Sequence, residues 1–484
     1  MNKVKKNILY NLAYQILVLI VPLITSPYIS RTLGAEGLGT YSYVSSVAYH
    51  FFILVTLGLS NYGNRSIAKC GDNTNERSRT FCSIYAMQLI CGGIVLASYL
   101  AYLLFFAEKI YKTYFLIYSL YILGAIVDVN WFFWGMQEFQ LTTKRNTFVK
   151  LATVISVFLF VRNESALTGY VFIVAGSTLF SNLILLTRIP RYVSFSKPTW
   201  NDVSSHFKPN FVLFVPVLAI SIYRVMDKIM IKELSGVVQN GYYENADRII
   251  TISMTAFSAV ATVMMPAVSN MVASGNNDRI KKILRDMMQV IMCLSIAMTF
   301  GLIAVAREFA PLFFGSQFIE TGYLMMGLAP TIILSGWKNV LRSQYLIPYE
   351  KDKAYVFSLI WGAVANVICN SIFIPKYGAR GAVLGTLVAE TVGFIIQTAV
   401  AGHDVCISEM FKDAALFVPD GLLMGVAVHY ILKMLPENLI GVLLAIFLGA
   451  ILYLLLAVST LYLFNRERLI YLLNLVKGRR KHEA

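Results

Sequence analysis

The chain has 484 residues, of which 57% are hydrophobic and only 14% are charged. Soluble domains carry about 25% charged residues, so this composition excludes an ordinary soluble enzyme or binding module. The formal net charge is +15, which would suggest a nucleic-acid partner for a soluble protein; in a membrane protein the placement of the basic residues matters more than their sum.

Apolar runs of roughly 20 residues recur along the whole chain, which is enough to cross a hydrocarbon core of about 30 Å. Backbone polar groups need internal partners in lipid, so these runs are expected to be helices. We predict an all-α polytopic membrane protein with about 14 transmembrane helices, at residues 8–30, 38–62, 81–106, 113–137, 147–161, 166–187, 210–233, 241–271, 286–305, 321–347, 355–375, 381–401, 415–432 and 439–463.

Lysine and arginine are spread unequally over the connecting segments. If the N-terminus is cytoplasmic, the inner segments hold 27 of the 41 basic residues, the outer segments hold 9, and 5 lie inside spans. This positive-inside bias predicts that both termini are cytoplasmic. The segment 144–150 is one of these basic inner loops, so Lys144 and Arg145 are expected there. Such a face can attract anionic headgroups, whereas nucleic-acid binding is not expected.

An internal repeat is visible between residues 21–44 and 215–249. Each copy runs from an apolar stretch with proline, through a helix interrupted by polar residues, to a glycine-containing loop and a Gly-x-Tyr motif. The matching residues are Gly39 and Gly241, and Tyr41 and Tyr243. Parallel repeats are typical of transporters with the substrate path between the halves.

The repeat predicts two homologous six-helix lobes followed by an extra helix pair. We expect an N-terminal lobe at 1–187, a cytoplasmic linker at 188–209, a C-terminal lobe at 210–401, and the helix pair with a basic cytoplasmic tail at 402–484.

The seventh and eighth spans carry six charges that sum to zero: Arg224, Asp227, Lys228, Glu244, Asp247 and Arg248. A charge at membrane depth costs about 3 kcal/mol or more unless it is paired or hydrated. One interpretation is an ion network that joins the two spans. The other is a substrate site in which the cations bind an anion and a carboxylate binds a coupling ion. Both predict a water-accessible cavity between the lobes.

Other spans also contain ionisable residues. Asp128 in the fourth span and Glu390 in the twelfth are candidates for proton or sodium coupling. Lys338 and Arg342, one helical turn apart in the tenth span, are candidates for phosphate contact, although Arg342 could equally reach headgroups by snorkelling.

Motifs for other chemistry are missing from the sequence. The six cysteines form no CxxC pair and no Cys/His cluster, so neither a disulfide nor a metal site is expected. There is no GxxxxGK[ST], HExxH or GxSxG motif. We therefore expect no ATP motor, no cofactor and no catalytic site.

Four segments resemble the polysaccharide transporter family, the Wzx-type oligosaccharide flippases of the multidrug/oligosaccharidyl-lipid/polysaccharide exporter superfamily. They are PYISRTLGAEGLGTYSYV (27–44), LGLSNYGNRSIAK (57–69), YRVMDKIMIKELSGVVQNGYYENADRI (223–249) and PKYGARGAVLGTLVAE (375–390). The first segment is the most specific to the family, whereas the later ones are shared more widely in the superfamily.

The resemblance implies a function and a location. Such proteins lie in the bacterial cytoplasmic membrane and move polyprenyl-diphosphate-linked oligosaccharides to the outer leaflet, for capsule, O-antigen or exopolysaccharide assembly. Possible partners are the polysaccharide polymerase and other assembly proteins. The alternatives are a cation-coupled drug antiporter of the same superfamily, a membrane glycosyltransferase or polymerase, and a structural scaffold for polysaccharide assembly.

The family motifs also implicate particular residues. Arg31 falls in SRxLG, Arg65 in NYGxR, and Asp227 and Lys228 in DKxMI. From their greater depth, we rank Arg224, Lys228 and Arg248 as better diphosphate ligands than Arg31 and Arg65.

Overall fold

The computed structural model describes residues 3–273, 277–402 and 404–464, and over these residues all regular structure is helical. The helices are α1 Lys3–Thr56, α2 Leu59–Lys69, α3 Thr74–Phe105, α4 Lys112–Ile126, α5 Asn130–Gly135, α6 Phe139–Phe160, α7 Leu167–Leu186, α8 Trp200–Ser204, α9 Phe207–Ser235, α10 Val237–Ala273, α11 Asn277–Phe314, α12 Ile319–Leu328, α13 Pro330–Leu341, α14 Asp352–Tyr377, α15 Ala379–Ala401, α16 Ile407–Ala415, α17 Val418–Met434 and α18 Leu439–Phe464. Short 3₁₀ turns and a π-helical turn at Arg342–Leu346 complete the element order.

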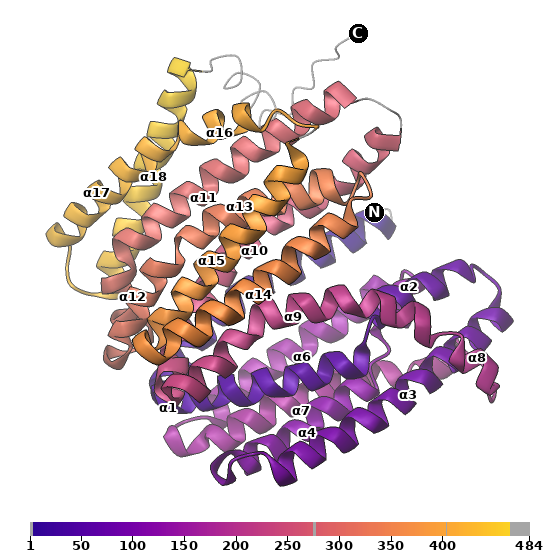
Figure 1. Cartoon of the computed structure of the whole chain (residues 1–484). Helices are drawn as coiled ribbons and strands as arrows, with labels where there is room; N and C mark the ends of the chain where they lie inside the picture. Colours follow the sequence, from indigo (N-terminus) through magenta and orange to yellow (C-terminus); the bar gives the residue numbers. More distant parts are fainter. Residues whose placement is uncertain (1–2, 274–276, 403, 465–484) are drawn as a thin grey trace. The chain divides into compact units, whose positions relative to one another are not determined.

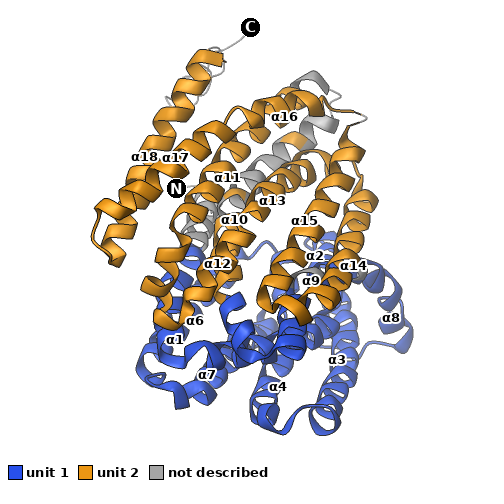
Figure 2. Ribbon diagram, turned by 60° about the vertical axis from the view of Figure 1, so that its left-hand side comes forward, with its two compact units in different colours: residues 1–244 blue, residues 245–484 orange. Residues whose placement is uncertain are grey.

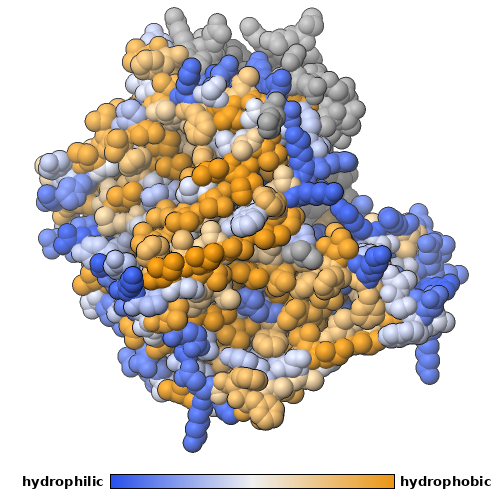
Figure 3. All heavy atoms as spheres, in the orientation of Figure 1, coloured by the Kyte–Doolittle hydropathy of each residue, from blue (hydrophilic) through white to orange (hydrophobic). Residues whose placement is uncertain are grey.

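The helices are long and apolar enough for a membrane protein with several spans. In the described part of the chain, nine qualify as candidate spans, or up to eleven if each of two bent helix pairs is one span. The predicted all-helical class is confirmed, whereas the count of fourteen spans stays a prediction. Figure 3 shows apolar side chains over most of the visible surface, with hydrophilic side chains gathered near its margins.

The chain divides into two compact units, residues 1–244 and 245–484 (Figure 2). In unit 1, α4 packs against α1, α3 and α7, and α9 packs against α1 (Figure 1). Fully buried aromatic residues, including Tyr99, Phe115 and Tyr118, fill the space around α4. This packing holds α1 and α9, which carry predicted site residues, in one body.

In unit 2, α11 is the helix with most neighbours, packing against α12, α13, α17 and α18. The hairpin of α14 and α15 is the other close pair, and α15 also packs against α13. Helices α14 and α15 approach each other closely because α15 has glycine where they meet. A methyl group on Gly385 would lie 2.0 Å from Asn370 Oδ1. The hairpin places Glu390 of α15 opposite Lys338 of α13.

Two glycines interrupt the helices of the internal repeat at matching places. Gly34 (φ 69°) kinks α1, and Gly236 (φ 105°) separates α9 from α10. L-residues with a side chain rarely adopt these angles, so glycine permits the turn at low cost. The two glycines have the same spacing as Gly39 and Gly241, which extends the predicted repeat.

Candidate functional site

Charged residues of α9 and α10 form a buried cluster in unit 1 with α1. Lys228 Nζ lies 2.8 Å from Glu244 Oε2, and the two side chains are only 16% and 10% exposed. Ser42 of α1 donates a hydrogen bond of 2.8 Å to the same carboxylate oxygen. Beside them, the Tyr243 hydroxyl donates to Asp227 Oδ2 at 2.8 Å. We call Ser42, Asp227, Lys228, Tyr243 and Glu244 the α9–α10 charge cluster.

This cluster contains the ion pair between the seventh and eighth spans that one interpretation of the sequence predicts. Asp247 and Arg248 follow on α10 and are half-buried. Arg224 lies on α9, but its side chain falls outside the described residues. Lys228 is thus already paired with a carboxylate, and Ser42 is a member that sequence reasoning missed.

The two copies of the repeat contact one another next to this cluster. A methyl group on Gly39 would lie 1.9 Å from the carbonyl oxygen of Val237, and one on Gly241 would lie 2.0 Å from that of Ala35. In the repeat, Gly39 corresponds to Gly241 and Ala35 to Val237, so the two contacts are equivalent. Reciprocal contacts of this kind define a local two-fold axis. The backbones of α1 and α10 therefore meet at a distance that only glycine permits.

A second ion-pair group lies at the end of α9. Lys232 is 8% exposed and pairs with Glu108 and, at 3.1 Å, with Glu233. Its ammonium also lies 4.4 Å from the ring centre of Tyr43. This lysine is held by two carboxylates and an aromatic face, which suits a structural role.

Asp128 lies in a break between α4 and α5, and Arg145 is close to it. Asp128 Oδ1 accepts hydrogen bonds from the backbone N–H of Asn130, at 2.8 Å, and from Asn130 Nδ2, at 2.6 Å. The side-chain oxygen of Asn130 in turn accepts one from the Arg145 guanidinium. Arg145 also donates to Ser181 and, at 3.1 Å, to Asn182 Oδ1.

The expectation of a loop around Arg145 is wrong. Arg145 lies inside α6 and is only 6% exposed. The apolar run starting at residue 147 hid the first turns of this helix. The spacing of the buried residues Thr142, Arg145 and Val149 was the available signal, because these positions share one helical face.

Unit 2 brings together two residues that were predicted for different roles. Lys338 Nζ lies 2.8 Å from Glu390 Oε2, with side chains 13% and 7% exposed. Ser335 donates a hydrogen bond of 2.5 Å to the same oxygen. The phosphate candidate and the ion-coupling candidate are therefore one buried ion pair, with the same Lys–carboxylate–Ser composition as the α9–α10 charge cluster.

The remaining predicted residues lie apart from these clusters. The Arg342 guanidinium lies 5.8 Å from the ring centre of Tyr355. Arg65 is exposed on α2, and Arg31 is exposed on α1. Arg31 lines a ≈ 670 Å³ hollow together with Arg162 and Tyr28.

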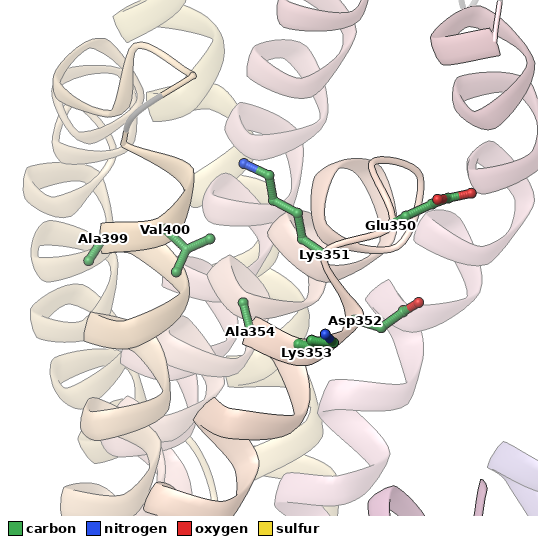
Figure 4. Close-up of a pocket in the computed structure, with 7 residues that line it drawn as sticks. All are labelled: Glu350, Lys351, Asp352, Lys353, Ala354, Ala399 and Val400. Carbon is green, nitrogen blue, oxygen red and sulfur yellow. The ribbon is translucent and has the colours of Figure 1, made fainter. Parts of the chain in front are cut away.

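A second hollow, of ≈ 900 Å³, lies between the segment 350–354 and the end of α15 (Figure 4). Glu350 and Asp352 point away from Ala399 and Val400, whereas Lys351 extends on the α15 side. Lys351 Nζ lies 2.6 Å from Asp404 Oδ2, and this hydrogen bond raises the pKa of the lysine. Its charge is thus already neutralised locally.

Among the described residues, no group of three or more His, Cys, Asp or Glu side chains has an arrangement that could hold a metal ion. The buried polar sites contain hydrogen-bonded amides, hydroxyls and ion pairs.

Comparisons with known proteins agree on one family. A family model described as "Polysaccharide biosynthesis protein" matches residues 4–272, more than half of the chain. A protein of Escherichia coli (strain K12) named as an O-antigen transporter is 21% identical over 80% of this chain and 94% of its own length. A protein of Haloferax volcanii named as a low-salt glycan biosynthesis flippase is 24% identical over 54% of this chain and 55% of its own length.

The fold is similar to that of a solved transporter structure. The structure titled "Lipid II flippase MurJ, inward closed conformation" superposes with a TM-score of 0.76 at 15% identity, covering 94% of this chain and 98% of that one. At this identity the likeness concerns the fold alone.

Proposed function

Because the chain belongs to the polysaccharide biosynthesis protein family, we propose that it is a flippase for lipid-linked oligosaccharides in a bacterial cytoplasmic membrane. The family match over residues 4–272 is the observation that carries the proposal. The names of the relatives, an O-antigen transporter and a glycan flippase, support this substrate class. The substrate would be a polyprenyl diphosphate bearing a sugar repeat unit, and the chain would move it without covalent chemistry.

The proposal includes fourteen spans, two lobes and cytoplasmic termini. Ion pairs between described residues of connecting segments and span ends support this topology, because each ion pair joins two residues that the topology places on the same side of the membrane. The inner pairs are Arg79 with Asp202, Arg285 with Glu409, and Lys351 with Asp404; the outer pairs are Lys232 with Glu108 and Arg380 with Glu320. A missed or extra span between two partners would put them on opposite faces.

In this mechanism a polar cavity binds the diphosphate-sugar head while the polyprenyl tail stays in lipid. Arg224, Lys228 and Arg248 are the proposed anion ligands, because cations at membrane depth attract a diphosphate strongly. For Lys228 this requires exchange of partners: the diphosphate takes the place of Glu244. Alternating access of the two lobes would then release the head outside.

The test locates the lipid-linked oligosaccharide in cells lacking this chain. A membrane-impermeant lectin is applied to intact cells and to inverted vesicles. We expect the glycan to be accessible only in the inverted vesicles, and the wild-type chain to restore its access from outside. Normal access from outside in the deletion strain would refute the flippase function and favour the drug-antiporter alternative.

The ligand assignment needs a variant of its own. Arg224→Gln, Lys228→Gln and Arg248→Gln are combined with Glu244→Gln, which removes the buried partner of Lys228. A matched control neutralises the exposed residues Arg162, Arg380 and Lys433. We expect the control to restore the glycan outside and the site variant to fail at equal membrane abundance. Restoration by the site variant would refute the assignment.

A further inference from the structure

The predicted fourth span is broken between α4 and α5, and the break is stabilised by side chains from neighbouring helices. The candidate span Lys109–Gly135 contains the end of α4 at Ile126 and the start of α5 at Asn130. Gln88 of α3 donates to the carbonyl oxygens of residues 125, 126 and 128, at 2.9–3.2 Å. Asn182 of α7 donates to the Gly124 carbonyl at 2.9 Å.

Irregular backbone at membrane depth is tolerated where it is buried in protein or lines a water-filled cavity. In transporters, such broken helices often carry ion sites. Here the break holds one carboxylate, Asp128, and a buried arginine stands beside it. The amides of Gln88 and Asn182 satisfy the carbonyl groups of the break, and Asp128 uses one oxygen for the backbone N–H of Asn130.

The two oxygens of Asp128 are unequal. Oδ1 accepts both hydrogen bonds from Asn130. For Oδ2, no hydrogen bond is found among the described residues, and Asp128 is partly exposed. An ionised carboxylate with one unoccupied oxygen can accept a proton there.

Arg145 is the charge that balances Asp128. Its hydrogen bonds go to the neutral oxygens of Asn130, Ser181 and Asn182. Its Nε is buried and has no hydrogen-bond partner within the described part of the chain. Because arginine stays protonated, the group is neutral when Asp128 is ionised and carries one positive charge when Asp128 is protonated.

The donors around Asp128 favour a proton over a metal ion. Sodium and other hard cations need several oxygen ligands. The groups that face Asp128 Oδ1 are N–H donors, and the nearest cation is a guanidinium that would repel a bound metal ion. A proton needs only a free lone pair.

We propose that the break in the fourth span is a proton-binding centre in which Asp128 takes up the proton and Arg145, acting through Asn130, is the positioning residue. A proton from water adds to Oδ2 and forms an O–H bond, and no other covalent bond breaks. The neutral acid then binds the two Asn130 N–H groups less strongly and leaves Arg145 uncompensated. Proton binding thereby loosens the start of α5 from α6.

Neighbouring helices contribute both titratable and neutral side chains to this centre. Tyr121 of α4 and Tyr14 of α1 are the titratable groups close to Asp128 and Arg145. From α3 and α7 come Gln88, Ser181 and Asn182, which do not titrate. If the chain is a flippase, as proposed above, this centre would couple flipping to the proton gradient.

Infrared difference spectra of the whole protein in lipid vesicles, recorded against pH, test the centre. We expect a carbonyl stretch of a protonated carboxylic acid that is present in the wild type and absent in Asp128→Asn. The control Glu164→Gln removes an exposed carboxylate of unit 1 outside the centre and should keep this band. An unchanged band in Asp128→Asn would overturn the proposal, and so would displacement of the band by sodium at constant pH.

The role of Arg145 is tested by the pH midpoint of the same band. Loss of an adjacent cation favours the neutral acid, so Arg145→Met should bind the proton about tenfold more tightly, a rise of about one pH unit. Arg145→Lys should restore most of the wild-type midpoint. If Arg145→Met does not accumulate, Asn130→Ala, which keeps both charges but removes the bridge, should raise the midpoint too. If Arg145→Met or Asn130→Ala keeps the wild-type pH midpoint of the band, Arg145 is only a packing residue.

The outcome is separable from that of the flippase test. A wild-type chain that restores the glycan outside, with a spectrum unaffected by Asp128→Asn, would overturn the proton centre alone. A wild-type chain that does not restore it would overturn the flippase function, while the infrared band would still report whether Asp128 binds a proton.

Discussion

At the scale of single residues, two buried lysine–carboxylate pairs have the same composition. Lys228 with Glu244 and Lys338 with Glu390 are both 2.8 Å pairs with side chains at most 16% exposed, and each carboxylate also accepts a hydrogen bond from a serine. Two charges removed from water are tolerated when they pair closely and their remaining lone pairs are satisfied. A substrate that uses either lysine must therefore displace a carboxylate.

Removing one member of the Lys228–Glu244 pair should destabilise the protein more than removing both. Lys228→Met or Glu244→Gln alone leaves a buried charge unpaired, which costs about 3–5 kcal/mol. The double variant removes both charges, and glutamine keeps a hydrogen bond to Ser42. Thermal unfolding of the purified variants measures the difference. Single variants as stable as the wild type would show that the pair is not closed in the membrane.

The same double variant separates stability from function. If Lys228 binds the substrate, the double variant accumulates normally but does not restore the glycan outside. If it restores the glycan, the pair is only structural.

At the scale of elements, glycines set how closely the repeat copies approach. The contacts of Gly39 with Val237 and of Gly241 with Ala35 bring backbone to within a distance that leaves no room for a methyl group. Asn240 of α10 adds a hydrogen bond of 2.9 Å to the Gly39 carbonyl. The contact between α1 and α10 in unit 1 is therefore specified by small residues and one amide.

Gly39→Ala and Gly241→Ala should each push these helices apart. Overpacking of this kind costs about 1–3 kcal/mol, and both variants should lower the unfolding temperature. The matched control is Gly176→Ala on α7, where a methyl group meets nothing within 4 Å. The control should be as stable as the wild type or slightly more stable, because alanine favours helix. Equal stability of all three variants would contradict the close contact.

At the scale of the whole molecule, the proposed topology depends on an even number of spans between segments that share a face. Cys406 offers a native probe of it, because the thiol is exposed in the described structure and lies in a predicted cytoplasmic segment. The positive-inside bias and the ion pairs between loops on the same side of the membrane are both interpreted correctly only if the segment with Cys406 is cytoplasmic.

A membrane-impermeant maleimide should label Cys406 only after the membrane is permeabilised. The measurement uses a variant whose other five cysteines are replaced, so that one thiol reports. Replacing Arg162 by cysteine in the Cys406→Ser form of that variant should give labelling in intact cells, because this segment is predicted outside. Labelling of Cys406 in intact cells would reverse or refute the topology.

The sequence by itself determined the properties that depend on local composition. Apolar length and the requirement for internal backbone hydrogen bonds determined an all-helical membrane protein, and the glycine spacing indicated the repeat. The family motifs added the proposed substrate class. Each of these signals lies within a short stretch of chain, so it can be read without knowing which helices are neighbours.

Only the tertiary structure decided which charges are partners. Glu390 lies 52 positions from Lys338 along the chain, and Arg145 reaches Asp128 through Asn130 and takes further partners from α7. Helical periodicity tells which face a residue occupies, but not which helix packs against that face. The burial of Arg145 was missed for this reason. A charged residue at this position suggests a loop, and only the packing of α7 brings the oxygens that lower the free-energy cost of burying the guanidinium.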